Sequence, residues 1–161
     1  MNKKEILPQD LPFDLKVREM CKSCKRFGSN AHCPPFIESV EYYKKLLSNY
    51  RYGILYYKTF DSSDKNKWKE TGKESSLELH ALLLEERDRL FKEGHYFISI
   101  FGAGGCKLCE TCSFPCRQPQ KAISPIEATG INVVKLMENY GIKVEFPIKD
   151  NFYRIGMVLY D

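Results

Sequence analysis

The sequence predicts an α/β (α+β) fold: a single-domain sandwich with a mixed sheet, helices packed against it, and cysteine-rich loops. Segments with helical and strand periodicity alternate along the chain, and two strand-like segments end it. The length of 161 residues suits one domain with its own core, residues 1–161. Apolar residues make up 43% of the chain and charged residues 29%, so disorder of the whole chain is excluded.

Regular elements are expected from the middle of the first half onwards. Residues 1–20 form a mixed segment in which prolines discourage helix. Apolar residues at helical spacing over 37–47 predict a helix. The aromatic and aliphatic run 52–60 predicts a buried strand, followed by a polar loop over 61–72.

A long helix should follow this loop. Ser75 and Glu78 have the spacing of a capping box, which predicts that the helix begins there. Gly94 should end it in the left-handed conformation, and residues 95–101 should form the next strand. The inner face of the helix is expected to carry Leu77, Ala81, Leu84 and Phe91.

The last third is expected to begin with a short helix and to end in a hairpin. Apolar residues over 133–140 predict the helix, and Gly141 should stop it. Residues 142–146 and 153–160 read as two strands joined around 149–151.

The cysteines fall into two groups within the loops 21–35 and 102–119. Their number, seven, is odd, so a fully paired disulfide framework is excluded. The chain has no apolar signal core near its start and no run long enough to span a membrane, so we expect a cytoplasmic protein with reduced thiols. The candidate metal ligands are Cys21, Cys24, Cys33, Cys106, Cys109, Cys112 and Cys116.

The second group has the more specific pattern. Cys106-x2-Cys109-x2-Cys112-x3-Cys116 matches the spacing with which bacterial ferredoxins bind a [4Fe-4S] cluster. Structural zinc sites more often use two C-x2-C pairs separated by a longer loop, so zinc is the alternative metal. The nearby Gly102, Gly104 and Gly105 should let the backbone turn sharply and approach a bulky inorganic core.

Spacing does not decide which cysteines share a centre. In one possible assignment, Cys116 is the fourth ligand of the centre formed by Cys21, Cys24 and Cys33. In a second assignment, all four cysteines of the second group bind one centre, and the first group then has only three cysteine ligands. A third assignment lets Cys33 complete the site of Cys106, Cys109 and Cys112. Seven thiols cannot fill two four-cysteine sites. Either one of two centres takes a ligand other than cysteine, or the protein binds only one [4Fe-4S] cluster. His32 is a candidate nitrogen ligand, although a surface or capping role is the interpretation we favour.

Several motifs together resemble one known family. They are Cys21-Lys-Ser-Cys24, Cys33-Pro-Pro, the run from Cys106 to Cys112, Pro115-Cys-Arg-x-Pro119, and residues 124–133. In this order they resemble the predicted metal-binding proteins of domain of unknown function 2284. The resemblance implies metal binding and assigns no reaction.

These observations leave three classes of function. The first is a small redox protein that exchanges electrons with a partner protein, and the second is an enzyme or metal-handling factor with an open coordination position. The third is a zinc-stapled interaction domain. The sequence contains no recognisable set of catalytic residues apart from the cysteines, so whether the protein is an enzyme stays open. The sequence does not indicate an oligomeric state. The net charge of +4 is spread along the chain, so neither a nucleic acid nor a membrane is an expected partner. Arg117 is expected to form a salt bridge with Glu127.

Overall fold

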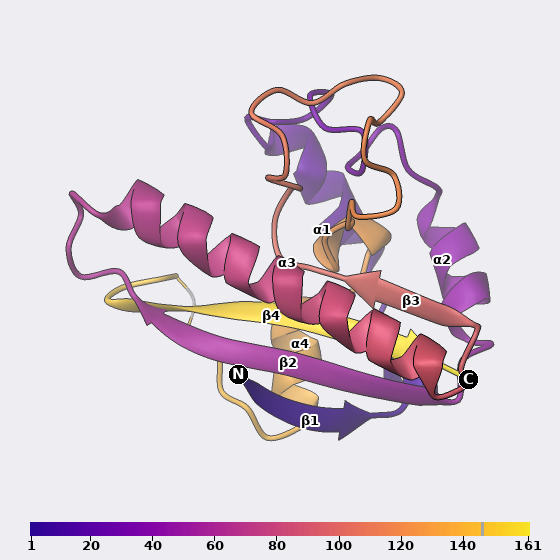
Figure 1. Cartoon of the computed structure of the whole chain (residues 1–161). Coiled ribbons are helices and arrows are strands. Elements are labelled where there is room, and N and C mark those ends of the chain that lie inside the picture. Colours follow the sequence, from indigo (N-terminus) through magenta and orange to yellow (C-terminus); the bar gives the residue numbers. More distant parts are fainter. Residues whose placement is uncertain (146) are drawn as a thin grey trace.

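A sheet of antiparallel strands forms the centre of the molecule (Figure 1). The computed structural model describes residues 1–145 and 147–161. Within them the sheet has four strands in the order β1 (Asn2–Ile6), β2 (Tyr52–Asp61), β4 (Asn151–Tyr160) and β3 (Ile98–Phe101). The α+β class is confirmed. The expected mixed sheet is wrong, because β4 lies between β2 and β3 and runs opposite to both.

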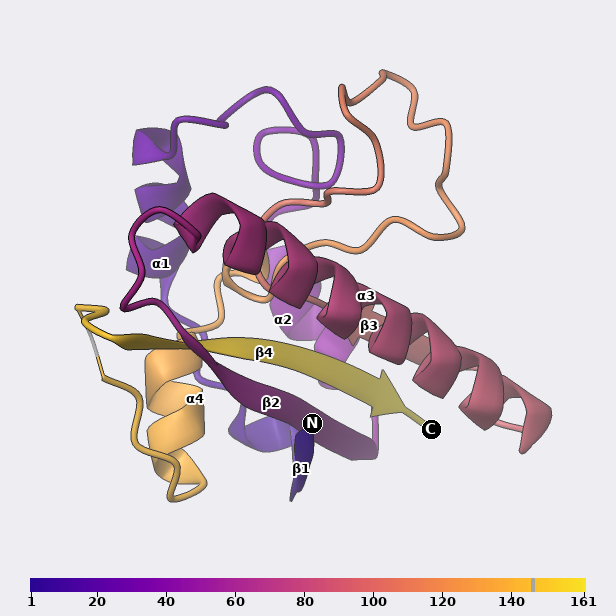
Figure 2. The same cartoon turned by 60° about the vertical axis from the view of Figure 1, so that its left-hand side comes forward.

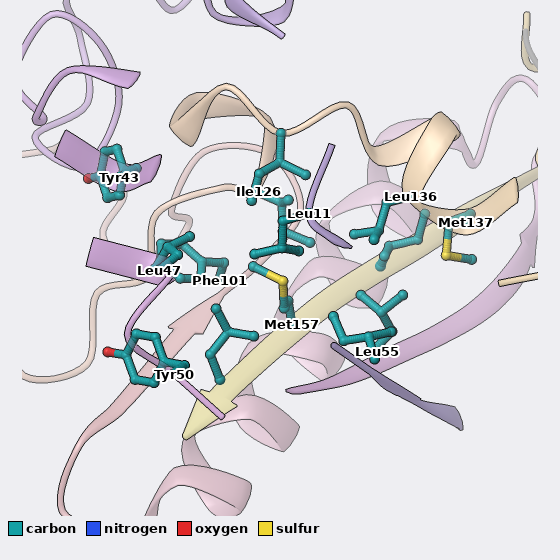
Figure 3. Packing of buried hydrophobic residues seen from close by; sticks show 14 residues of the cluster. Leu11, Tyr43, Leu47, Tyr50, Leu55, Phe101, Ile126, Leu136, Met137 and Met157 are labelled. Carbon is teal, nitrogen blue, oxygen red and sulfur yellow. The ribbon is translucent and has the colours of Figure 1, made fainter. Parts of the chain in front are cut away.

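Helices cover both faces of this sheet (Figure 1, Figure 2). The long helix α3 (Trp68–Lys92) packs on one face, and α2 (Val40–Leu47) and α4 (Val133–Asn139) pack on the other. Strand alternation divides the core in the same way, since Met157 and Leu159 of β4 face α2 and α4 while Val158 faces α3. Figure 3 shows the first of these clusters. The remaining elements are α1 (Leu15–Met20) and the 3-10 turns Pro8–Asp10, Cys21–Ser23 and Glu127–Thr129.

Most of the expected elements are present. The helix over 37–47, the strand over 52–60 and the short helix before Gly141 correspond to α2, β2 and α4. The expected strand over 95–101 is β3, which begins later than predicted. Gly94 and Gly141 both have positive φ, as expected of helix caps.

The predicted start of α3 is wrong. The helix begins at Trp68, and Ser75 lies inside it with an exposed fraction of only 1%. The Ser75 hydroxyl donates to the carbonyl of Gly72 (3.3 Å) and accepts from Arg154 Nε (2.9 Å). Ser75 is therefore a buried polar contact between α3 and β4, and it does not cap the helix.

The predicted inner face of α3 also needs correction. The buried apolar residues are Leu79, Leu83 and Leu90. Of the four predicted residues, Leu84 is partly buried against this cluster, whereas Leu77, Ala81 and Phe91 are exposed. Gly156 on β4 explains the close packing, since a Cβ there would lie 2.8 Å from Leu79 Cδ1. The helix face that meets Gly156 is therefore the buried one.

The predicted C-terminal hairpin is also wrong. Residues 142–145 form no strand, and the rest of the first expected strand, Phe146, lies outside the described residues. The second expected strand, β4, pairs with β2 and β3 instead. Two elements near the N-terminus, β1 and α1, were not predicted. Among the described residues, none of the helices combines the length and apolar character needed to cross a membrane.

Candidate metal centre

The two cysteine loops lie side by side, above the sheet in both views (Figure 1, Figure 2). Asn30 of the first loop is buried and donates from Nδ2 to the carbonyl of Cys106 (3.2 Å). The backbone N–H of Ala31 lies 3.3 Å from Cys112 Sγ and donates to it. The rings of Phe36 and Phe114 also pack together, with centroids 4.7 Å apart. Two loops that are far apart in the sequence therefore form one structure.

The second loop leaves the end of β3 and returns to the same place. The N–H of Gly102 donates to the carbonyl of Ser124 (2.9 Å), and the N–H of Ile126 donates to the carbonyl of Gly102 (2.9 Å). Gly104 has a φ of 69°, which supports the predicted sharp turn after the strand. Gly105 comes close to the first loop, since a Cβ on it would lie 3.7 Å from Cys33 Sγ.

One pocket is lined by all four cysteines of the second group. Its lining includes His32 of the first loop together with Cys106, Cys109, Cys112 and Cys116. Gln118 donates to two of these sulfurs, from Nε2 to Cys109 Sγ (3.2 Å) and from its backbone N–H to Cys116 Sγ (3.4 Å). The same donors would be in place to hydrogen-bond the sulfur of a metal-bound cysteine.

The first group is assembled by local turns. Cys21 follows α1 directly, and the N–H of Cys24 donates to the carbonyl of Cys21 (3.0 Å). The N–H of Cys33 donates to the carbonyl of Asn30 (3.2 Å). Burial, and then the negative charges of Cys21, Cys24, Cys106 and Glu127, raises the pKa of Cys33 to about 11. Cys33 therefore lies within the electrostatic range of both cysteine groups.

Positive charges surround the loops unevenly. Lys22 is exposed and pairs with Glu19 (2.6 Å), so it has its own partner outside the cysteine group. Lys107 lies inside the second loop, and its pKa is lowered to about 8 by burial first and then by the charges of Arg154 and Arg26. These cations would be stabilised by any net negative charge that a thiolate-bound centre brought to the loops.

Two buried side-chain atoms near the thiols have no hydrogen-bond partner among the described residues, His32 Nε2 and Glu127 Oε2. Burial lowers the pKa of His32, which favours the neutral ring, and burial raises the pKa of Glu127. We favoured a surface or capping role for His32. This interpretation is wrong for the Nε2 atom, which is buried, and His32 lines the pocket of the second cysteine group. An unpartnered buried polar atom is costly, and a bound metal ion or other ligand would remove that cost.

The expected salt bridge between Arg117 and Glu127 is absent from the ion pairs of the described residues. Arg117 instead donates to Ser113 Oγ (3.2 Å) and to the carbonyl of Thr111 (3.1 Å), both in its own loop. The sequence analysis placed Glu127 only in a salt bridge with Arg117, and it did not single out Asn30. The signal for Glu127 was the thiol count, which leaves one ligand missing from two four-ligand centres.

The donor chemistry of the loops suits zinc or iron. All seven cysteines are free thiols, and a nitrogen and an oxygen donor atom are enclosed near them. Within residues 1–145 and 147–161, no three Cys, His, Asp or Glu side chains already converge closely enough to hold one metal ion.

Comparison with known proteins agrees with this chemistry. A search of curated proteins and a search of solved structures give no significant match. A family model described as "Predicted metal-binding protein (DUF2284)" matches residues 4–160, which include both loops and the strands β2, β3 and β4. The chain therefore belongs to the DUF2284 family of predicted metal-binding proteins.

Proposed function

We propose that the protein binds [4Fe-4S] clusters at its cysteine loops and exchanges electrons with a partner protein. One observation carries the proposal: the four thiols of a ferredoxin-spaced run line a single pocket. Cys106, Cys109, Cys112 and Cys116 would be the ligands there. A bound cluster would supply one-electron chemistry at that pocket.

The surrounding residues would tune this centre. Gln118 donates to the sulfurs of Cys109 and Cys116, and hydrogen bonds to ligand sulfur raise a reduction potential. The thiols are half-buried, so the centre would be close to the surface and accessible to a partner. The exposed rings of Phe36 and Phe114 lie at the junction of the two loops and offer apolar contact area beside it.

Anaerobic purification of the full chain tests the metal. We expect brown protein with roughly four or eight irons per chain, matching sulfide, and an electron paramagnetic resonance signal after reduction. Cys109→Ser should remove the iron of the second loop, whereas Ala81→Ser, at an exposed position on α3, should keep it. Full iron in Cys109→Ser would contradict the proposed ligand set.

A zinc-stapled domain is the second candidate. Residues 103–124, all described, contain no helix or strand, and hydrogen bonds to Gly102 close the segment at its base. A metal that only holds such a loop in shape would account for the cysteines equally well. Colourless protein with stoichiometric zinc after anaerobic purification and iron reconstitution would favour this candidate over the cluster.

A further inference from the structure

We propose that Glu127 is the fourth ligand of a metal centre whose other three ligands are Cys21, Cys24 and Cys33. The identity of the metal rests on the proposed function. The ligand set rests on four observations of the chain itself: an unpartnered oxygen, the charges around it, the contacts that fix its position, and the number of thiols.

The first observation is the state of the Glu127 carboxylate. Its Oε2 atom is buried and has no hydrogen-bond partner among the residues that the structure describes. Leaving a buried polar atom unsatisfied is unfavourable, and it is more so when the group is charged. A cation bound to this oxygen would remove the cost.

The second observation is the set of charges around it. The negative charge of Glu127 acts on the thiols of both Cys21 and Cys33, so the three groups lie within electrostatic range of one another. Arg154 also acts on Glu127, but its guanidinium donates to Ser75 Oγ and to the carbonyl of Gly72. No cation of the described chain forms an ion pair with this carboxylate. A cation bound to this carboxylate would therefore have no competing ion pair to displace.

The third observation is the way the chain fixes Glu127 relative to Cys21. Arg18, on the helix that leads into Cys21, donates from Nη1 to the carbonyls of Ala128 (2.7 Å) and Glu38 (2.8 Å). The N–H of Asp14, which caps the same helix, donates to the carbonyl of Gly130 (2.8 Å). The turn that carries Glu127 is thus tied at two points to the helix that positions the first cysteine.

The fourth observation is the number of ligands. Seven thiols and one carboxylate give eight ligands, enough for two four-ligand centres. The second group then keeps all four of its cysteines, and the first group gains the ligand that it lacks. Carboxylate oxygen is an accepted ligand of both iron and zinc, and it is harder than thiolate. The two centres would therefore differ in chemistry, with the oxygen-ligated one more open to ligand exchange.

Metal content in a set of variants tests this assignment. Glu127→Gln keeps the shape of the side chain and removes its charge, so iron per chain should fall to about half of the wild-type value. Cys24→Ser should cause the same loss, and the double variant should lose no more than either alone, because all three changes disable one centre. Glu138→Gln, at an exposed position on α4, is the matched control and should retain full iron.

Stability separates ligation from a merely structural role. Metal-free Glu127→Gln should be at least as stable to urea as the metal-free wild type, since it replaces a buried, unpartnered ionisable group with a neutral one. Full iron with an unchanged paramagnetic spectrum in Glu127→Gln would overturn the proposal, as would further metal loss in the double variant. If the wild type carries zinc instead of iron, the proposed function fails, and zinc content in the same variants still decides the role of Glu127.

Discussion

The sheet and the cysteine loops of this protein are built by different means. The sheet side depends on apolar burial, with Leu55, Met157 and Leu159 fully enclosed between β2, β4 and the helices. The loop side consists of short turns around thiols that are half-buried, or exposed in the case of Cys24, and polar contacts such as that of Asn30 link these turns. The sheet should therefore fold without metal, and metal should add stability chiefly to the loops.

We expect the largest loss of stability from a substitution in the apolar core beside the sheet. Leu159→Ala removes a fully buried side chain that packs over Gly53 and should cost about 2–5 kcal/mol of unfolding free energy. Urea unfolding followed by circular dichroism should show the same loss with and without metal. Leu77→Ala, on the exposed side of α3, is the control and should change little. A loss confined to the metal-loaded protein would break the distinction between the two regions.

We expect an intermediate loss of stability when a hydrogen bond between the two cysteine loops is removed. Asn30→Ala removes the bond to the Cys106 carbonyl and the acceptor of the His32 N–H (2.9 Å) and should cost about 1–3 kcal/mol. Amide hydrogen exchange should become faster in both loops and stay unchanged in β2 and β4. Asn49→Ala removes a side chain that bonds only within the end of its own helix, so it should leave the loops unaffected. Uniform acceleration across the sheet would argue against independent regions.

We expect the smallest loss of stability from removal of the cap of α2, which lies between the first cysteine loop and the sheet. Ser39 caps α2 by accepting from the N–H of Tyr42 (3.1 Å), and Ser39→Ala should cost about 1 kcal/mol. Thermal unfolding of the metal-free protein should show a lower Tm. Ser48→Ala, at the other end of α2, should have a smaller effect, because its hydroxyl bonds only to the carbonyl of Lys45. Equal shifts in the two variants would remove any special role for the cap.

The sequence predicted those helices and strands whose own residues carry the characteristic pattern. The α2 helix has apolar residues at helical spacing and a serine cap, and β2 has a continuous run of residues that favour strands. The edge strand β1 was missed because four of its five residues are exposed and only Ile6 is buried. Such a strand shows no alternation, and its formation depends on pairing with β2.

Errors arose where distant residues decide the outcome. Ser75 has the sequence context of a cap, yet Arg154 from β4 gives it a partner inside the helix. The close approach at Gly156 likewise sets which leucines of α3 are buried, and no local pattern contains it. At the candidate site the cysteine spacing identified the candidate thiols and left open which of them share a centre. The contacts of Asn30, Gln118 and Arg18 depend on the folded loops and could not be read from spacing.

The position of β4 in the sheet has a consequence for synthesis on the ribosome. This strand comes after both cysteine loops in the chain, and it is the strand partner of β3 among the described residues. The loop that begins after β3 therefore leaves the ribosome before its supporting strand has been made. During that interval its thiols are held by no completed scaffold and are open to oxidation or to the wrong metal. Correct loading is thus expected to follow completion of the sheet, at a stage when the nascent chain has already reached β4.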